Sequence, residues 1–172
     1  MDELSITEVV ESEIGELFAL MKKTFLDAFE KDNTKEDIQL YLTEKLNNAQ
    51  VAKEYHETNS KFYFARIKGH IIGYLKLNYD KSLTDTDSKS LEIERIYIAQ
   101  EHQGYKYGQV LLDFAIDKAK EIGTSNIWLG VWEKNSDAIR FYQKNGFEIF
   151  DQYTFLLGRD KQTDLLMKLL IS

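Results

Sequence analysis

The sequence predicts an α/β fold with a mixed sheet, and three observations point to it. Apolar residues recur at spacings of three and four at residues 14–29 and again at 110–122, which is typical of amphipathic helices. Short runs of β-branched and aromatic residues, bounded by turn residues, lie between and after these two segments and predict strands. The order is a strand, two helices, a meander of strands, then helix, strand, helix and two strands, which is typical of an α/β domain.

The first half of the chain opens with a short strand at residues 5–10 and continues with helices. The apolar positions of residues 14–29 define the first helix. After a polar break, Thr34 followed by Asp37 is typical of a capping box and predicts a second helix. Residues 47–60 are polar, and one more short helix within them is left open.

The remaining elements follow from the same two patterns, with a loop in the middle. Residues 80–90 are rich in Asp, Ser, Thr and Lys, so we expect a solvated loop there. The expected strands span residues 62–67, 71–77, 91–98, 127–132, 147–156 and 164–171, and the expected helices span residues 110–122 and 136–144.

One of these strands changes the face on which its apolar side chains lie. Leu91 and Ile93 fall on one parity, whereas Ile96 and Ile98 fall on the other. Because side chains alternate along a strand, this change indicates a β-bulge, which leaves backbone N–H and C=O groups unpaired. A strand covered on both faces is the alternative.

Composition excludes several classes of protein. The 22 Lys and Arg residues are outnumbered by 29 Asp and Glu residues, and the net charge of −7 argues against nucleic acid as the main partner. There is no cysteine, which excludes disulfides and thiol catalysis. The three histidines, His56, His70 and His102, have no metal-ligand spacing, so no metal site is predicted.

The sequence shows no sign of export or membrane insertion. It starts with acidic residues instead of an apolar leader, and no apolar stretch reaches about 18 residues. Proline is absent, and no linker-like segment divides the chain. We therefore expect a single cytoplasmic domain over residues 1–172 that has no contact with membranes.

A glycine-containing turn at residues 103–108 runs directly into the helix at 110–122. Such a turn aims backbone N–H groups and the positive end of the helix dipole at one point, which suits a phosphate or pyrophosphate. It is not a Walker A loop, because no Gly-Lys-Ser/Thr triplet ends it.

The turn, the bulged strand and the motif Asn-x-x-Ala-Ile-x-Phe-Tyr-x-Lys-x-Gly-Phe at residues 135–147 form one combination. This combination resembles the GCN5-related N-acetyltransferase (GNAT) superfamily over nearly the whole chain. Within it, the sequence most resembles the bacterial spermidine/spermine N-acetyltransferases of the PaiA type. The residues that carry this closer resemblance are Thr24, Phe25, Asp27, Phe29, 91–98, 126–135 and 162–165.

The resemblance implies the GNAT fold, a mostly antiparallel sheet of about seven strands with a bulged fourth strand and about four helices. It also implies acetyl-CoA as cosubstrate, with the pantetheine arm on the bulged strand and the pyrophosphate on the glycine turn. The implied cofactor-binding residues are Ile96, Tyr97, Ile98, Gln103, Gly104, Tyr105, Lys106, Tyr107, Gly108, Gln109, Asn135, Ala138 and Lys144. One departure is Lys106, which replaces the first glycine of the family pattern Arg/Gln-x-x-Gly-x-Gly/Ala.

The implied chemistry is acyl transfer from a thioester to an amine. By resemblance, Tyr142 is the general acid that protonates the leaving thiolate, and Glu94 is a base that acts through water. A backbone N–H of the bulged strand, at Tyr97, is expected to hold the oxyanion. For Glu94 the alternative is an exposed strand carboxylate in an ion pair.

The acceptor is expected to be a small amine, spermidine or spermine, with Phe25, Asp27, Phe29 and Glu92 as substrate-binding residues. These residues could instead be ordinary core and solvated surface. Two other functions stay open: acetylation of another amine (an amino acid, an antibiotic or a protein N-terminus or lysine), and an acyl-CoA-binding regulatory module with little turnover. Family members often form dimers, which leaves a homodimer open.

Overall fold

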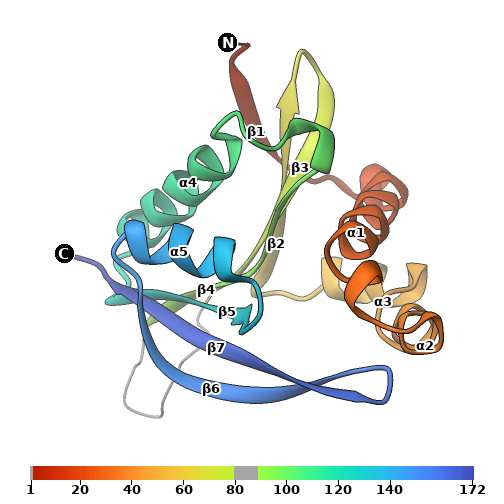
Figure 1. Cartoon of the computed structure of the whole chain (residues 1–172). Helices are drawn as coiled ribbons and strands as arrows, with labels where there is room; N and C mark the ends of the chain where they lie inside the picture. Colours follow the sequence, from red (N-terminus) through yellow and green to blue (C-terminus); the bar gives the residue numbers. More distant parts are fainter. Residues whose placement is uncertain (1, 80–88) are drawn as a thin grey trace.

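A computed structural model describes residues 2–79 and 89–172 of the chain as one seven-stranded sheet with helices on both faces (Figure 1). The sheet order is β1-β2-β3-β4-β5-β7-β6, and β4 and β5 are the pair that runs parallel among the described strands. The mixed, mostly antiparallel sheet of the GNAT fold is thereby confirmed. The strands are β1 (Leu4–Glu8), β2 (Ser60–Ile67), β3 (His70–Tyr79), β4 (Ser90–Ile98), β5 (Asn126–Trp132), β6 (Glu148–Leu157) and β7 (Asp160–Leu170).

Five α-helices are present in the described ranges, where the resemblance implied about four. They are α1 (Ile14–Phe29), α2 (Lys35–Glu44), α3 (Asn48–Tyr55), α4 (Tyr107–Glu121) and α5 (Ser136–Lys144). The additional helix is α3, in the polar segment that the sequence left open. Its cap is Asn47, whose Oδ1 accepts from the backbone N–H of Gln50 at 2.9 Å. The Thr34 cap of α2 is confirmed by a hydrogen bond of 3.1 Å from the backbone N–H of Asp37.

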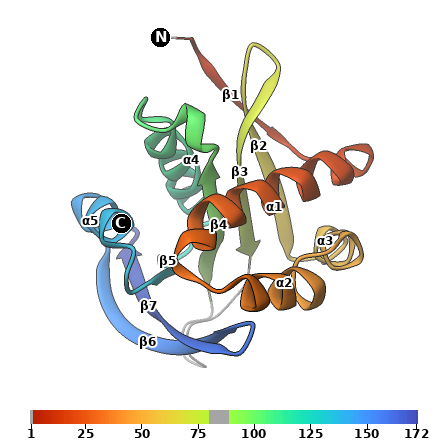
Figure 2. The ribbon, with the colours of Figure 1, turned by 45° about the vertical axis from the view of Figure 1, so that its right-hand side comes forward.

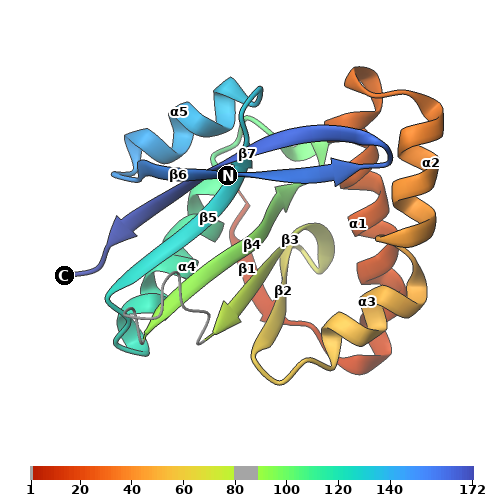
Figure 3. The same cartoon turned by 90° about the horizontal axis from the view of Figure 1, so that it is seen from below.

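The two faces of the sheet are covered by different helices. Alternate residues of β2 show the division, because Phe62 and Phe64 pack in the core under α1–α3, whereas Tyr63 and Ala65 pack in the core under α4 and α5. Figure 2 shows α1–α3 in front of the strands, and Figure 3 shows the two groups of helices on opposite sides. All four of these β2 side chains are buried. The loop expected at residues 80–90 falls mainly outside the described residues.

The predicted β-bulge is present in β4. Lys76 of β3 lies opposite Arg95, whereas the next residue, Leu77, lies opposite Ile93, so Glu94 is the extra residue. On the other side, β4 pairs with β5 only from Ser90 to Ile93. The two parallel strands therefore separate from Glu94 onward, and the edge of β4 that faces β5 loses its partner there.

The hairpin of β6 and β7 reaches from the sheet to α2, closing one end of this gap (Figure 3). Gly158 at the hairpin turn has φ +65°, and a Cβ there would lie 2.4 Å from the Cα of Asp37. The carboxylate of Asp37 accepts the backbone N–H of Arg159 at 2.8 Å. Glycine is required at this turn for both conformation and close approach.

None of the helices in the described part of the chain is both long and apolar enough to span a bilayer.

Candidate active site

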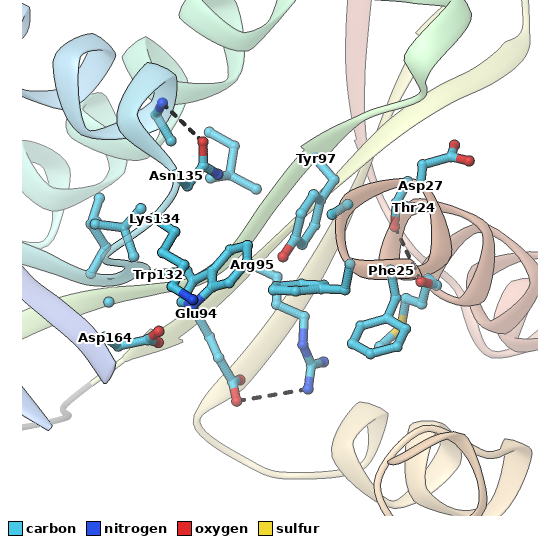
Figure 4. A pocket seen from close by; sticks show the side chains of 18 of the residues that line it. Thr24, Phe25, Asp27, Glu94, Arg95, Tyr97, Trp132, Lys134, Asn135 and Asp164 are labelled. Carbon is cyan, nitrogen blue, oxygen red and sulfur yellow. Dashed lines mark hydrogen bonds and ion pairs between the residues drawn. The ribbon is translucent and has the colours of Figure 1, made fainter. Parts of the chain in front are cut away.

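A cavity of about 1130 Å³ opens where β4 and β5 separate (Figure 4). Its walls come from α1, α2, the second half of β4, the end of β5 with the start of α5, and the β6–β7 hairpin. Residues far apart in the sequence, from Met21 to Asp164, thus meet around one space. A cavity at the point where two parallel strands part is a common place for ligand binding in α/β folds.

The cavity brings together one part of the predicted cofactor site. The predicted residues that line it are Ile96, Tyr97, Ile98, Gln103, Asn135 and Ala138. Because β5 no longer pairs with β4 beyond Ile93, the backbone of Ile96–Ile98 can bond an extended ligand as if it were an added strand. This geometry fits a pantetheine arm.

Three predicted polar residues use their side chains for structure. The Oδ1 of Asn135 caps α5 by accepting the backbone N–H of Ala138 at 3.2 Å, which leaves its Nδ2 to donate into the cavity. Gln103 donates to the carbonyl of Ile98 at 3.0 Å. Gln109 donates to Asn145 at 2.7 Å, and so ties the start of α4 to the end of α5.

Apart from Gln103, the predicted pyrophosphate loop lies outside the walls of the cavity, at the start of α4. The predicted residues that do not line the cavity are Gly104, Tyr105, Lys106, Tyr107, Gly108, Gln109 and Lys144. Residues 103–106 are exposed. Gln109 and Val110 donate their backbone N–H groups to the carbonyl of Lys106, whereas those of Tyr107 and Gly108 precede the first bonds of the helix. An anion at this surface would meet those N–H groups and the helix dipole.

Lys106, where the family has glycine, adopts the left-handed conformation with φ 65° and ψ 16°. The chain therefore keeps the backbone geometry that a glycine would supply, at a cost of about 1 kcal/mol for the Cβ. Its ammonium group is on the exposed side of the loop, where it can attract a phosphate.

Two substitutions at this position separate strain from charge. Lys106→Gly and Lys106→Ala both remove the ammonium group, but only the alanine variant keeps a Cβ. We expect Lys106→Gly to be more stable than Lys106→Ala by about 1 kcal/mol in urea unfolding. Equal stabilities would show that the left-handed conformation is not adopted.

Tyr142, the predicted general acid, lies in α5 with its side chain buried at the wall of the cavity. Its ring contacts Phe141 and Phe147 in edge-on geometry, with centroid distances of 5.2 and 5.8 Å. Burial, with a smaller contribution from Tyr97, raises the pKa of the Tyr142 phenol above its ordinary value. The hydroxyl thus keeps its proton at neutral pH, as a proton donor must.

Glu94, the predicted base, is the bulged residue of β4 and belongs to a cluster of ion pairs. Its carboxylate bonds the buried Lys76 ammonium, lies 3.9 Å from Arg95 and accepts from Asn78 at 3.1 Å. Burial would raise the pKa of Glu94, but Arg95 and Lys76 outweigh burial and lower it. Glu94 lines the cavity, and two cations already balance its charge.

Glu54 of α3 anchors the same cluster from the opposite side. It accepts from Lys76 at 3.1 Å and from Arg95 at 2.7 Å, while only 9% of its side chain is exposed. Burial would raise the pKa of Glu54, but the contacts with Arg95 and Lys76 lower it to about 2. These charges hold the bulged segment of β4 against α3.

The predicted acceptor residues are only partly brought together. Phe25 stacks on Tyr41 with a centroid distance of 4.5 Å, and Phe29 contacts Trp132 at 5.5 Å, so aromatic rings form one wall of the cavity. Asp27 also lines it. Glu92 is buried, accepts from Asn78 at 2.5 Å, and lies outside the walls of the cavity.

Sequence reasoning did not assign Asp164 or the buried Lys76 to the site. Asp164 lies in the segment 162–165 that carried the resemblance, but no role was attached to it. Lys76 interrupts the apolar strand at residues 71–77, and a charge at such a position signals a buried partner. Within residues 2–79 and 89–172, no group of three His, Cys, Asp or Glu side chains is placed to hold a metal ion.

Comparison with known proteins decides the family. The acetyltransferase (GNAT) family matches residues 18–147 of the chain. The chain belongs to this family. An uncharacterised N-acetyltransferase from Lactobacillus delbrueckii subsp. lactis is 39% identical over 169 residues, which cover 98% of both proteins.

Solved structures of GNAT enzymes share the fold. The PaiA N-acetyltransferase of Thermoplasma acidophilum in complex with coenzyme A aligns over 96% of this chain and 98% of that one, with a TM-score of 0.76 and 21% identity. The spermidine N-acetyltransferase of Vibrio cholerae in complex with coenzyme A and spermine aligns over 98% and 95%, with a TM-score of 0.71 and 19% identity. At these identities the likeness concerns the fold.

The GNAT chain described here is an acetyl-CoA-dependent N-acetyltransferase. The gap between β4 and β5 and the N-terminus of α4 fit acetyl-CoA as cosubstrate. The polar and aromatic walls of the rest of the cavity are available to bind the acceptor.

Proposed function

We propose that this GNAT enzyme transfers the acetyl group of acetyl-CoA to a primary amine of spermidine or spermine. The observation that carries the proposal is the wall of the cavity formed by α1, α2 and the β6–β7 hairpin. There the rings of Phe25, Phe29, Tyr41 and Trp132 lie in the same cavity as the carboxylates of Glu94 and Asp164.

Each feature of this wall matches one part of a polyamine. Aromatic rings pack against the methylene spacers and attract the ammonium groups through their π faces. Carboxylates bind an ammonium group by charge-assisted hydrogen bonds and raise the local concentration of a polycation. Glu94 is already paired with Lys76 and Arg95, so Asp164 is the one of these two carboxylates that is available to an ammonium group.

In the proposed reaction, Tyr142 donates its proton to the thiolate of coenzyme A as the C–S bond breaks. The backbone N–H of Tyr97, on the free stretch of β4, is proposed to stabilise the oxyanion of the tetrahedral state. The resemblance implies Glu94 as the water-linked base, but its pairs with Lys76 and Arg95 suit a role in fixing the bulge better than proton transfer.

The proposal is tested by following free thiol release from acetyl-CoA with spermidine, spermine, putrescine, lysine and a peptide with a free N-terminus. We expect saturable turnover with spermidine or spermine, and a kcat/KM at least about 10-fold above that for lysine. Preferred turnover of lysine or the peptide would assign the enzyme another amine. If no amine of this panel reacts while calorimetry still detects coenzyme A binding, the polyamine assignment fails, which leaves another acceptor or a binding module.

A further inference from the structure

The strands on the acceptor side of the cavity place three side chains in one row across the sheet. Asp164 of β7 lies opposite Trp132 of β5 and also opposite Tyr153 of β6. Residues directly opposite in paired strands project from the same face. All three side chains line the cavity, and Asp164 is at the centre of the row.

The carboxylate of Asp164 lies in a space that the backbone of β5 leaves open. A Cβ on Gly130 would lie 3.3 Å from Asp164 Oδ2 and 3.4 Å from the ring of Tyr153, closer than most side-chain contacts. The same oxygen accepts the hydroxyl of Tyr153 at 3.2 Å. Figure 4 shows the Asp164 carboxylate pointing into the cavity, below Trp132.

Asp164 and Glu94 line the same cavity but differ in how their charge is balanced. Glu94 pairs with Lys76 and Arg95. For Asp164, no lysine or arginine of the described ranges forms an ion pair, and Tyr153 is its hydrogen-bonding neighbour. A half-buried carboxylate without a cation is poised to accept a positive charge or a proton from a ligand.

We propose that Asp164 is a catalytic residue that takes the proton from the ammonium group of the acceptor. This inference rests on the proposed transfer of acetyl to an amine, and it holds for any primary amine that enters the cavity. The substrate arrives as an ammonium ion, since its ordinary pKa is near that of lysine, about 10. Its nitrogen has no lone pair for attack until that proton is removed.

The ammonium group gives one proton to the Asp164 carboxylate, and the freed lone pair forms the N–C bond to the thioester carbonyl. As the C–S bond breaks, the thiolate takes a proton from Tyr142. The new amide nitrogen loses its second proton, which restores the Tyr142 phenol through water, and Asp164 releases its proton to solvent. The net products are the acetylated amine, coenzyme A and one proton.

The surroundings of Asp164 support this role. Burial raises the pKa of Asp164 to about 6, and the hydrogen bond from Tyr153 limits the rise. A base with a pKa near the working pH transfers protons most effectively. The titratable groups that interact with Asp164 are Tyr153 of β6, Tyr97 of β4 and Tyr41 of α2. Glu94, Arg95 and Lys134 line the same cavity, and Glu92 acts on Tyr153.

The pH dependence of kcat/KM tests the assignment. In the unmodified enzyme, activity is expected to rise with pH through an acid limb near 6, because Asp164 must be ionised. Asp164→Asn is expected to lose about 10²-fold or more in kcat and to lose this limb. Tyr153→Phe removes the hydrogen bond that favours the ionised form, so the limb is expected to move to higher pH.

Two controls keep the result specific to Asp164. Asp151→Asn removes an exposed carboxylate of β6 outside the cavity. This variant is expected to keep both the kcat of the unmodified enzyme and the acid limb of its pH profile. Glu94→Gln is expected to keep the limb near 6, whatever its effect on the rate. Binding of coenzyme A by each variant, measured by calorimetry, shows that the fold is intact.

Either of two results would overturn the inference. The first is an Asp164→Asn enzyme whose pH profile keeps the acid limb near 6. The second is an unmodified enzyme whose acid limb lies below 4.5, the ordinary pKa of a glutamate, because a Glu94 base would place it there. Both results require turnover by the unmodified enzyme. Absence of turnover with every amine would instead contradict the proposed function, so the two failures are distinct.

Discussion

Tyr142→Phe is expected to lower kcat by about 10²-fold while leaving the affinity for coenzyme A unchanged. The substitution removes one oxygen from a buried side chain and keeps the ring that packs on Phe141 and Phe147. The loss is therefore in proton donation to the leaving thiolate. The measurement is initial thiol release at saturating acetyl-CoA and amine, with coenzyme A binding followed by calorimetry.

A matched control is Tyr55→Phe, which removes a phenol from α3 away from the cavity and is expected to keep full activity. If Tyr142→Phe is as active as the unmodified enzyme, Tyr142 is a core aromatic residue and the thiolate receives its proton elsewhere. Because burial raises the pKa of Tyr142, its ionisation is expected to affect the rate only in strongly alkaline solution.

Glu54→Gln is expected to lower the free energy of unfolding by about 3 kcal/mol. The substitution removes a buried negative charge that contacts Lys76 and Arg95, and so leaves both cations with Glu94 as their remaining carboxylate partner in the cluster. Two buried cations that share one carboxylate are costly. The control is Glu57→Gln, at an exposed residue just after α3, which is expected to change the free energy of unfolding by less than about 0.5 kcal/mol. Urea unfolding at neutral pH measures both variants.

The same cluster predicts how stability depends on pH. The pKa of Glu54 is lowered to about 2 from an ordinary value of 4.5, so its contribution is complete above 4.5 and is lost as the pH falls toward 2. The difference in stability between the unmodified protein and Glu54→Gln is expected to shrink over this range. A Gln variant as stable as the unmodified protein at neutral pH would show that the ion pairs do not hold the bulged strand.

The fold could be predicted where local pattern and burial agree. The bulge in β4 was visible because Ile93 and Ile96 lie on opposite parities, and the register shift at Glu94 is its structural cause. Helix α3 could not be predicted from pattern, because its stability depends on ion pairs between Glu54 and residues distant in the sequence. Such ion pairs produce no periodic spacing of apolar residues.

The candidate site could be predicted only where a motif marks it. Tyr142 and Asn135 came from one short motif, and both line the cavity. Asp164 could not be predicted from this motif, because its proposed role depends on the register of three strands and on the absence of a side chain at Gly130. Lys106 stands at a motif position, but its left-handed backbone depends on the turn into α4.

Competition between amines gives the sharpest test of acetyl transfer to a polyamine. Spermidine, lysine and a peptide with a free N-terminus are mixed at equal concentrations with limiting acetyl-CoA, and the products are identified by mass spectrometry. Acetylated spermidine is expected as the main product, because of these three amines spermidine best matches the aromatic rings and the Asp164 carboxylate of the cavity. Acetyl-lysine or acetylated peptide as the main product would contradict the proposed specificity for a polyamine.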